Sequence, residues 1–150
     1  MGSDWHEVIR LLGGEAALGS RPRTERDLVG LIREGFSTRV LVAIMETVGG
    51  LDTLAEVTHL NKRTLQRRLE GGPRATARNR LTAEESERLA RLARVVAAAE
   101  SVFRDEKKAR TWLGRENRAL GQVPMTLLDT DLGTQAVLDE LGRIAHGTFA

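Results

Sequence analysis

The sequence predicts an all-α protein, folded as a helical bundle, and three observations favour that class. Apolar residues recur at the three- and four-residue spacing of a helix face in almost every segment. A Ser, Thr, Asn or Asp precedes several of these segments and glycines follow many of them, as is typical of helix caps and stops. We find no segment with the pattern of a strand.

The helices expected before the middle of the chain are short and are separated by glycines. We expect them over residues 5–12, 24–35, 38–48, 51–58 and 62–70, the second capped by Thr24 and the third beginning at Ser37 or Thr38. Gly71-Gly72-Pro73 breaks the pattern, and the polar residues as far as Arg80 are typical of a linker. This predicts an N-terminal region at 1–72, a linker at 73–81 and a C-terminal domain at 82–150.

The C-terminal domain begins with a capping-box sequence, in which Thr82 is followed three residues later by Glu85. The longest expected helix begins at this box. On its solvent-exposed face we expect the ion pairs Glu84–Arg88 and Glu87–Arg91. Its buried stripe is predicted to be Leu89, Leu92, Ala93, Val96 and Phe103. A helix capped by Asp105, a turn at Pro124 and a last helix over 134–145 are expected to follow.

Composition and motif spacing argue against an enzyme and against a cofactor. The chain has no cysteine, so thiolate catalysis, thiolate metal sites and disulfides are excluded, which fits a cytoplasmic location. His6, His59 and His146 lie far apart, and none has a second ligand at a metal-binding spacing. Ser86 has no base nearby and no flanking glycines of a nucleophile elbow. No apolar run reaches the ~20 residues of a membrane span, and no signal peptide opens the chain.

A basic helix-turn-helix pattern occupies the middle of the chain. Ala55 allows the two helices to cross closely, Leu60 fills the turn, and Asn61 caps the second helix. Leu65 and Leu69 then point inward, which places the polar side chains on the opposite face. Arginine and glutamine make bidentate contacts with guanine and adenine edges in the major groove. The predicted DNA-binding residues are Lys62, Arg63, Thr64, Gln66, Arg67 and Arg68.

The same pattern also fits a solvated basic helix on an ordinary bundle. His59 stands where the turn of a helix-turn-helix usually has glycine, and Thr58 is more polar than that position normally is. The residues alone therefore leave DNA binding and a purely structural role open.

A set of motifs over most of the chain resembles one family. The motifs comprise 27–29, 32–35, 54–55, 63–69, 85–89, Ala109, 112–113, Asn117, 119–121, Pro124, 127–130 and 141–150. In this order they closely resemble the Xre/MbcA/ParS antitoxins of bacterial toxin–antitoxin pairs whose toxin has a RES domain. The resemblance weakens only in about the first 20 residues.

The resemblance implies an Xre-like DNA-binding region followed by a helical toxin-binding domain. It implies a RES-domain toxin as partner, which acts on NAD by degrading it or by ADP-ribosylating a target. It also implies that the C-terminal end of the antitoxin occludes the toxin's active site, that the antitoxin represses a shared promoter, and that it forms a homodimer or a hetero-oligomer with the toxin.

The residues of the C-terminal end are compatible with such a role. Arg143 falls outside the stripe of Val137, Leu141 and Ile144, so we expect it to face a partner. The imidazole, glycine and aromatic ring beyond it suit a nucleotide cleft, although a frayed terminus is the ordinary alternative. The predicted toxin-binding residues are Arg143, Ile144, His146, Gly147, Thr148 and Phe149.

The large apolar residues of the C-terminal domain are interpreted differently. Trp112, Leu120, Leu127 and Leu128 stand at helical spacing and are expected in the core, with the Trp112 indole N–H bound to a carbonyl. Asp129 and Asp131 are expected as helix caps. The main alternative to an antitoxin is a stand-alone DNA-binding transcriptional regulator whose C-terminal helices form a dimer.

Overall fold

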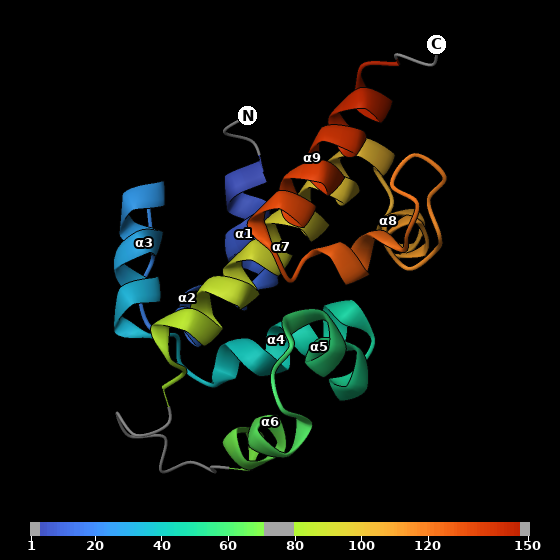
Figure 1. Ribbon diagram of the computed structural model, residues 1–150. Coiled ribbons are helices and arrows are strands. Elements are labelled where there is room, and N and C mark those ends of the chain that lie inside the picture. Colours follow the sequence, from blue (N-terminus) through green and yellow to red (C-terminus); the bar gives the residue numbers. More distant parts are fainter. Residues whose placement is uncertain (1–3, 71–79, 148–150) are drawn as a thin grey trace.

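The computed structural model describes residues 4–70 and 80–147, and they form the helical bundle that the sequence predicts (Figure 1). Over these residues there is no strand; only two isolated bridges, Ser37 with Arg80 and Asn117 with Gln122, join extended backbone. The elements are α1 (Asp4–Leu11), α2 (Gly14–Leu18), α3 (Glu25–Glu34), α4 (Arg39–Val48), α5 (Leu51–Thr58), α6 (Lys62–Leu69), α7 (Ala83–Phe103), α8 (Glu106–Leu113), the 3-10 turn η2 (Pro124–Leu127) and α9 (Asp131–Ala145).

Helix α7 is the central element of the fold. Its capping box forms as predicted: the Thr82 hydroxyl accepts a hydrogen bond from the Glu85 N–H at 3.0 Å, and the Glu85 carboxylate accepts one from the Thr82 N–H at 2.8 Å. Most of its faces are buried, because α1, α3, α8 and α9 all pack against it (Figure 1). The stripe predicted at Leu89, Leu92, Ala93 and Val96 is buried, and a second buried face carries Ala90, Val95, Ala97 and Ala99. One core therefore runs through the whole bundle.

Two helix boundaries differ from the sequence prediction. The chain does not stop at the glycine pair after α1 but forms α2 directly, with Gly13 and Gly14 in the left-handed conformation between the two helices. Helix α9 begins at Asp131 rather than Thr134, because the Thr130 hydroxyl accepts the Gly133 N–H at 2.9 Å. Thr130, and not Asp129 or Asp131, is therefore the cap of α9.

The start of α7 is fixed to the end of α3 through a close backbone approach at Gly35. The Leu81 N–H donates to the Phe36 carbonyl at 2.8 Å, and the Ser86 hydroxyl accepts the Phe36 N–H at 2.8 Å. Gly35 itself has φ +90°, and a Cβ on it would lie 2.0 Å from the Leu81 carbonyl oxygen. The backbone can make this crossing only with glycine.

Gly35→Ala is expected to destabilise the protein by about 2–4 kcal/mol, because the methyl group would force the two segments apart in addition to the strain of positive φ. Gly30→Ala is the matched control, since Gly30 lies inside α3 with nothing within 4 Å of an added Cβ. The control should be neutral or stabilise by up to about 1 kcal/mol. Urea unfolding of both variants checks the prediction, and equal stabilities would contradict it.

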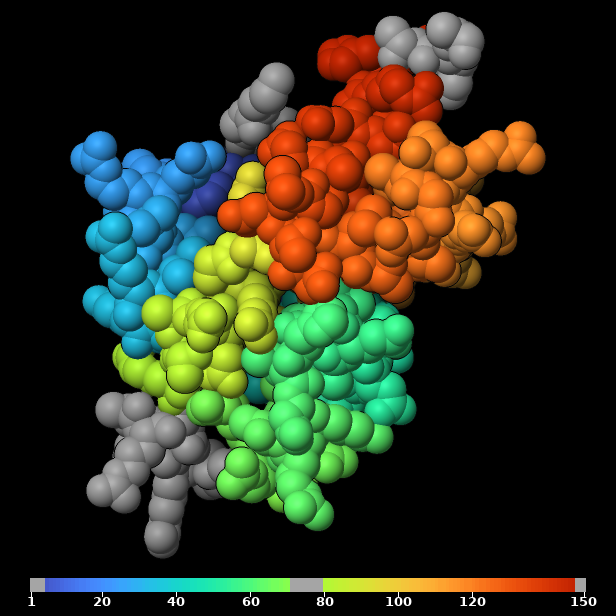
Figure 2. All heavy atoms as spheres, in the orientation of Figure 1, coloured from blue at the N-terminus to red at the C-terminus, as the bar shows by residue number. Residues whose placement is uncertain are grey.

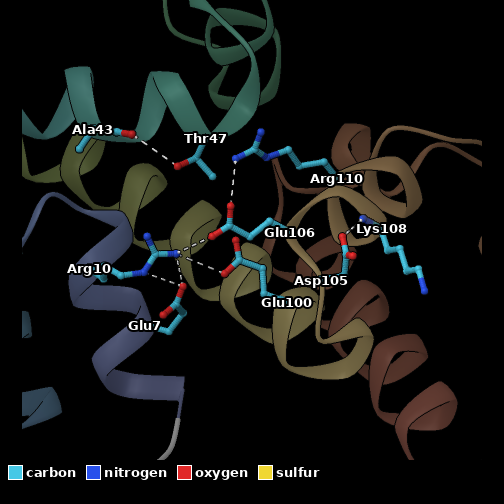
Figure 3. A network of polar contacts seen from close by, with 9 residues as sticks. All are labelled: Glu7, Arg10, Ala43, Thr47, Glu100, Asp105, Glu106, Lys108 and Arg110. Atoms are coloured by element: carbon cyan, nitrogen blue, oxygen red, sulfur yellow. Dashed lines mark hydrogen bonds and ion pairs between the residues drawn. The ribbon is translucent and has the colours of Figure 1, made fainter.

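Charged groups of α1, α7 and α8 meet at one polar junction (Figure 3). The Arg10 guanidinium pairs with Glu7 and lies 3.5 Å from both the Glu100 and the Glu106 carboxylates. Arg110 approaches Glu106 at 3.9 Å. Burial, together with the hydrogen bond to Glu7, raises the pKa of Glu100 to about 7, whereas the hydrogen bond from Arg10 lowers the pKa of Glu7. Glu7 and Glu100 therefore share a proton below neutral pH.

This junction predicts a fall in stability between about pH 4.5 and pH 7. In that window the folded chain holds a proton on Glu100 that the unfolded chain has released, so folding becomes less favourable as pH rises towards 7 and levels off above it. Glu100→Gln should be more stable than the native protein at pH 8, by about 1–2 kcal/mol after allowance for solvent screening, and near-equal at pH 5. Glu46→Gln, on an exposed face of α4, is the control. Thermal melts at both pH values measure the difference, and a difference independent of pH would contradict the prediction.

Candidate functional site

Helices α5 and α6 form the helix-turn-helix that the sequence predicts. His59 takes the left-handed conformation, with φ 56°, at the position where glycine is usual. The buried Thr58 hydroxyl donates to the Leu54 carbonyl at 2.6 Å, which accounts for a polar residue there. The Asn61 carboxamide oxygen caps α6, accepting the N–H of Arg63 at 2.9 Å and of Thr64 at 3.3 Å. The departures at Thr58 and His59 are thus accommodated within the motif.

The outward face of α6 presents Arg63, Gln66 and Arg67, all exposed. Leu65 is fully buried and Leu69 half-buried, so the helix is held in the orientation that the pattern predicts. The guanidinium of Arg67 lies 3.5 Å from the hydroxyl of Thr64, which is itself half-buried. These side chains form a polar and basic face with the chemistry that base edges and phosphates require.

Two of the predicted DNA-binding residues form ion pairs within the protein. Arg68 donates to the Arg80 carbonyl at 3.0 Å and pairs with the buried Glu85 carboxylate at 3.1 Å, so it fastens α6 to the beginning of α7. Lys62 pairs with Asp52 of α5 at 2.5 Å and stays half-exposed. Arg63, Gln66 and Arg67 are therefore the predicted residues best placed to reach DNA.

The turn between α5 and α6 is fixed to the C-terminal half of the chain. The Arg88 guanidinium donates to the Thr58 carbonyl at 3.2 Å, instead of pairing with Glu84 as expected. The His59 imidazole lies 3.4 Å from the Asp129 carboxylate, between η2 and α9. Arg91 pairs with Glu87, as expected, and also with Asp131 at 3.1 Å. Sequence spacing identified only the Glu87–Arg91 contact, because the others join residues distant in the chain.

The end of α9 carries the described part of the predicted toxin-binding set. Arg143 is exposed, and it donates to the buried Glu140 carboxylate at 2.9 Å. This hydrogen bond raises the pKa of Arg143. Ile144 is half-buried, whereas His146 and Gly147 are exposed. Helical order ends at Ala145, and Gly147 takes φ +66°. Thr148 and Phe149 lie outside the described residues.

The two candidate surfaces lie at opposite ends of the molecule. In Figure 1, α6 is at the lower end and α9 finishes at the upper end, with α7 running between them. The space-filling view shows the same separation (Figure 2). A partner on one end therefore leaves the other end accessible.

Comparison with known proteins assigns each end of the molecule to a known type of domain. Residues 27–94 match the profile of the antitoxin Xre-like helix-turn-helix domain, and residues 98–147 match that of the antitoxin Xre/MbcA/ParS C-terminal toxin-binding domain. The chain belongs to the Xre antitoxin family. Proteins called Antitoxin Xre are similar over most of their length: that of Yersinia enterocolitica is 37% identical over 82% of this chain and 81% of its own. The protein of Photorhabdus laumondii is 32% identical over 80% and 79%, and that of Pseudomonas putida 37% identical over 77% and 69%.

The two family profiles meet inside α7 rather than at the expected linker. The helix-turn-helix match ends at residue 94 and the toxin-binding match begins at residue 98, both within α7 (Ala83–Phe103). The linker predicted at 73–81 lies almost entirely outside the described residues, and the three-part division stays a prediction. In this Xre-family chain both matched regions therefore share one continuous helix.

The aromatic residue Trp112 packs against the core, as expected, but is only partly buried. It is half-buried, its ring centroid lies 5.8 Å from that of Phe103, and no carbonyl acceptor for its indole is found over the described residues. Leu128 is buried as predicted, and Leu120 and Leu127 are partly buried against the core.

Two further findings bear on the function classes weighed from the sequence. Within residues 4–70 and 80–147, no group of three or more His, Asp or Glu side chains is arranged to hold a metal ion. None of the helices described is both long enough and apolar enough to cross a membrane.

Proposed function

We propose that this Xre-family protein is an antitoxin that neutralises a RES-domain toxin acting on NAD. The observation that carries the proposal is the match of residues 98–147 to a toxin-binding domain, in a chain whose relatives are called Antitoxin Xre. The RES fold and the NAD chemistry of the partner follow from the resemblance of the motifs. The protein itself acts as a non-enzymatic regulator in the cytoplasm and needs no cofactor.

The neutralising element is the C-terminal end, in which the end of α9 leads into the last residues of the chain. His146 and Gly147 are exposed, and Arg143 places a cation beside them through its pair with Glu140. Together with Thr148 and Phe149 they enter and fill the toxin's NAD cleft. The imidazole and the aromatic ring suit a nucleotide cleft, and the Arg143 cation pairs with acidic or polar groups at its rim.

The same molecule represses its own promoter through α6. Arg63, Gln66 and Arg67 are exposed on one face of a capped recognition helix, and this supports DNA binding as the second activity. Binding by a helix-turn-helix usually involves a dimer on two half-sites, so DNA binding requires a homodimer or an assembly with the toxin. A stand-alone transcriptional regulator with a C-terminal dimer interface is the alternative, and the exposed face of α6 is the observation that favours it.

Co-expression tests the proposal. The open reading frame beside this gene is induced alone and together with the full-length protein, and growth and cellular NAD are followed. The antitoxin proposal expects the neighbour alone to stop growth and deplete or consume NAD, and the full-length protein to restore both. A neighbour that is harmless alone, together with specific binding of this protein to the promoter, would support the stand-alone regulator instead.

A further inference from the structure

An open apolar pocket lies on the outer side of α8. Phe103, at the end of α7, and Trp112, on α8, line it with their rings inclined at 43°. The pocket has a volume of about 380 Å³, which accommodates a large side chain. Ala109 and Leu113, on the inner face of α8, are completely buried. Phe103 and Trp112 pack against this core with only part of their surface, and both rings also line the open pocket.

The rim of this pocket is basic. Lys107, Lys108 and Arg115 line it together with a single carboxylate, that of Glu116. Over the described residues, none of these three cations forms an ion pair, because no carboxylate oxygen lies within 4.0 Å of their nitrogen atoms. Of the acids that precede Lys107, Asp105 caps α8 by accepting the Lys108 N–H at 3.0 Å, and the Glu106 carboxylate lies 3.5 Å from the Arg10 guanidinium. The field at the pocket mouth is therefore positive and favours an anionic partner.

The pocket faces the same end of the molecule as the candidate neutralising segment. Helices α7 and α9 pack side by side and run in the same direction, so Phe103 and the end of α9 lie towards one end (Figure 1). All residues that line the pocket fall within the range that matches the toxin-binding domain. A body that covers the end of α9 is therefore in a position to extend over α8.

We infer that this pocket is a second docking site for the toxin, which receives an apolar side chain carried on an acidic segment. The inference rests on the proposed toxin partner. The half-buried Trp112 and Phe103 supply the apolar contact, and tryptophan and arginine are the residue types that most often dominate interface affinity. Lys107, Lys108 and Arg115 surround the contact and pair with the acidic groups. The C-terminal end occludes the active site, while this pocket holds the toxin in place.

The double variant Lys108→Glu with Arg115→Glu tests the basic rim in the full-length chain. Both side chains are exposed. Lys108 lies in the first turn of α8, where a glutamate is favourable, and Arg115 lies beyond the end of this helix, so the fold is retained. The expected result is at least a tenfold weaker affinity for the purified protein encoded by the neighbouring open reading frame. The salt dependence of the affinity should fall as well. Arg63→Glu with Arg67→Glu, which changes the net charge by the same amount at the other end, should leave affinity within twofold.

A second measurement reports on Trp112 directly. The chain is labelled with 5-fluorotryptophan, which gives resonances for Trp5 and Trp112 that Trp5→Phe assigns. Adding unlabelled toxin should shift the Trp112 resonance and leave that of Trp5 in place. A shift confined to Trp5 would overturn the inference, because Trp5 lines a different groove, formed mainly by α1, α3 and α7.

The outcomes separate this inference from the proposed function. Loss of affinity in the rim variant with a Trp112 shift supports the second docking site. Native affinity in the rim variant, with growth still restored by the full-length protein, overturns the pocket and leaves the antitoxin role intact. A native chain that neither binds the neighbouring protein nor restores growth overturns both. Self-association lost in the rim variant, with toxin affinity unchanged, would assign the pocket to a second copy of the chain and overturn the inference.

Discussion

A version of the protein that ends at Gly142 is expected to leave the toxin active, so that growth stops and cellular NAD falls as they do with the toxin alone. The truncation removes Arg143, His146 and Gly147 from the exposed end of α9, together with the residues beyond them. It leaves the capped beginning of α9 and the buried Val137 and Leu141 in place. The loss should therefore fall on occlusion of the toxin and not on the fold. Growth curves and NAD measured after induction check the result.

The control must separate the missing segment from a disturbed helix. Removing Arg143 leaves the buried Glu140 without its guanidinium, and an uncompensated buried carboxylate is costly. A version that ends at Gly147 keeps this pair and the whole of α9, and is expected to neutralise only in part. Binding to promoter DNA should be native-like in both versions, whereas the melting temperature should be native-like for the Gly147 version and lowered for the Gly142 version. If the Gly142 version restored growth fully, the C-terminal end would not be the inhibitory element, and the pocket at Trp112 would be the next surface to test.

The sequence predicted most of the helices, because their signals are local. Thr24, Asn61, Thr82 and Asp105 all cap the helices that they precede, since a cap needs only the next two or three backbone N–H groups. The two errors in boundary have local causes as well. A glycine pair can join two helices as well as end one, so the pattern did not predict α2. Thr130, which caps α9, lies between Asp129 and Asp131, and aspartate is an equally good cap by residue type.

The contacts that decide the role of single residues were not predictable in this way. Arg68 has the same surroundings in sequence as Arg67, yet it turns inward to Glu85 at the beginning of α7. The junction of Glu7, Arg10 and Glu100 joins helices α1 and α7, which the sequence separates by most of the N-terminal half. Helical periodicity places a side chain on a face, and only the packing of the helices determines what lies opposite that face.

The double variant Arg63→Glu with Arg67→Glu is expected to weaken binding to promoter DNA by about 100-fold or more. A bidentate contact of arginine with guanine contributes about 1–3 kcal/mol, and reversing the charge adds repulsion from the phosphates. Both side chains are exposed on α6, so the fold should not change. Affinity for a labelled promoter fragment, measured over a range of salt, checks the prediction. Native binding with roughly six to eight phosphate contacts should weaken by orders of magnitude between low and moderate salt, and the variant should show a shallower dependence.

The reciprocal variant gives this prediction its control. Lys108→Glu with Arg115→Glu changes the net charge equally, but at the pocket on α8, in the half of the chain that matches the toxin-binding domain. It should bind promoter DNA as the native protein does, whereas the α6 variant should still restore growth in the presence of the toxin. Because the end of α9 and α6 lie at opposite ends of the molecule (Figure 1), each activity can be removed without the other. Equal loss of DNA binding in both variants would mean that total charge, and not the face of α6, determines affinity. DNA binding that is insensitive to salt would exclude the basic face as the site.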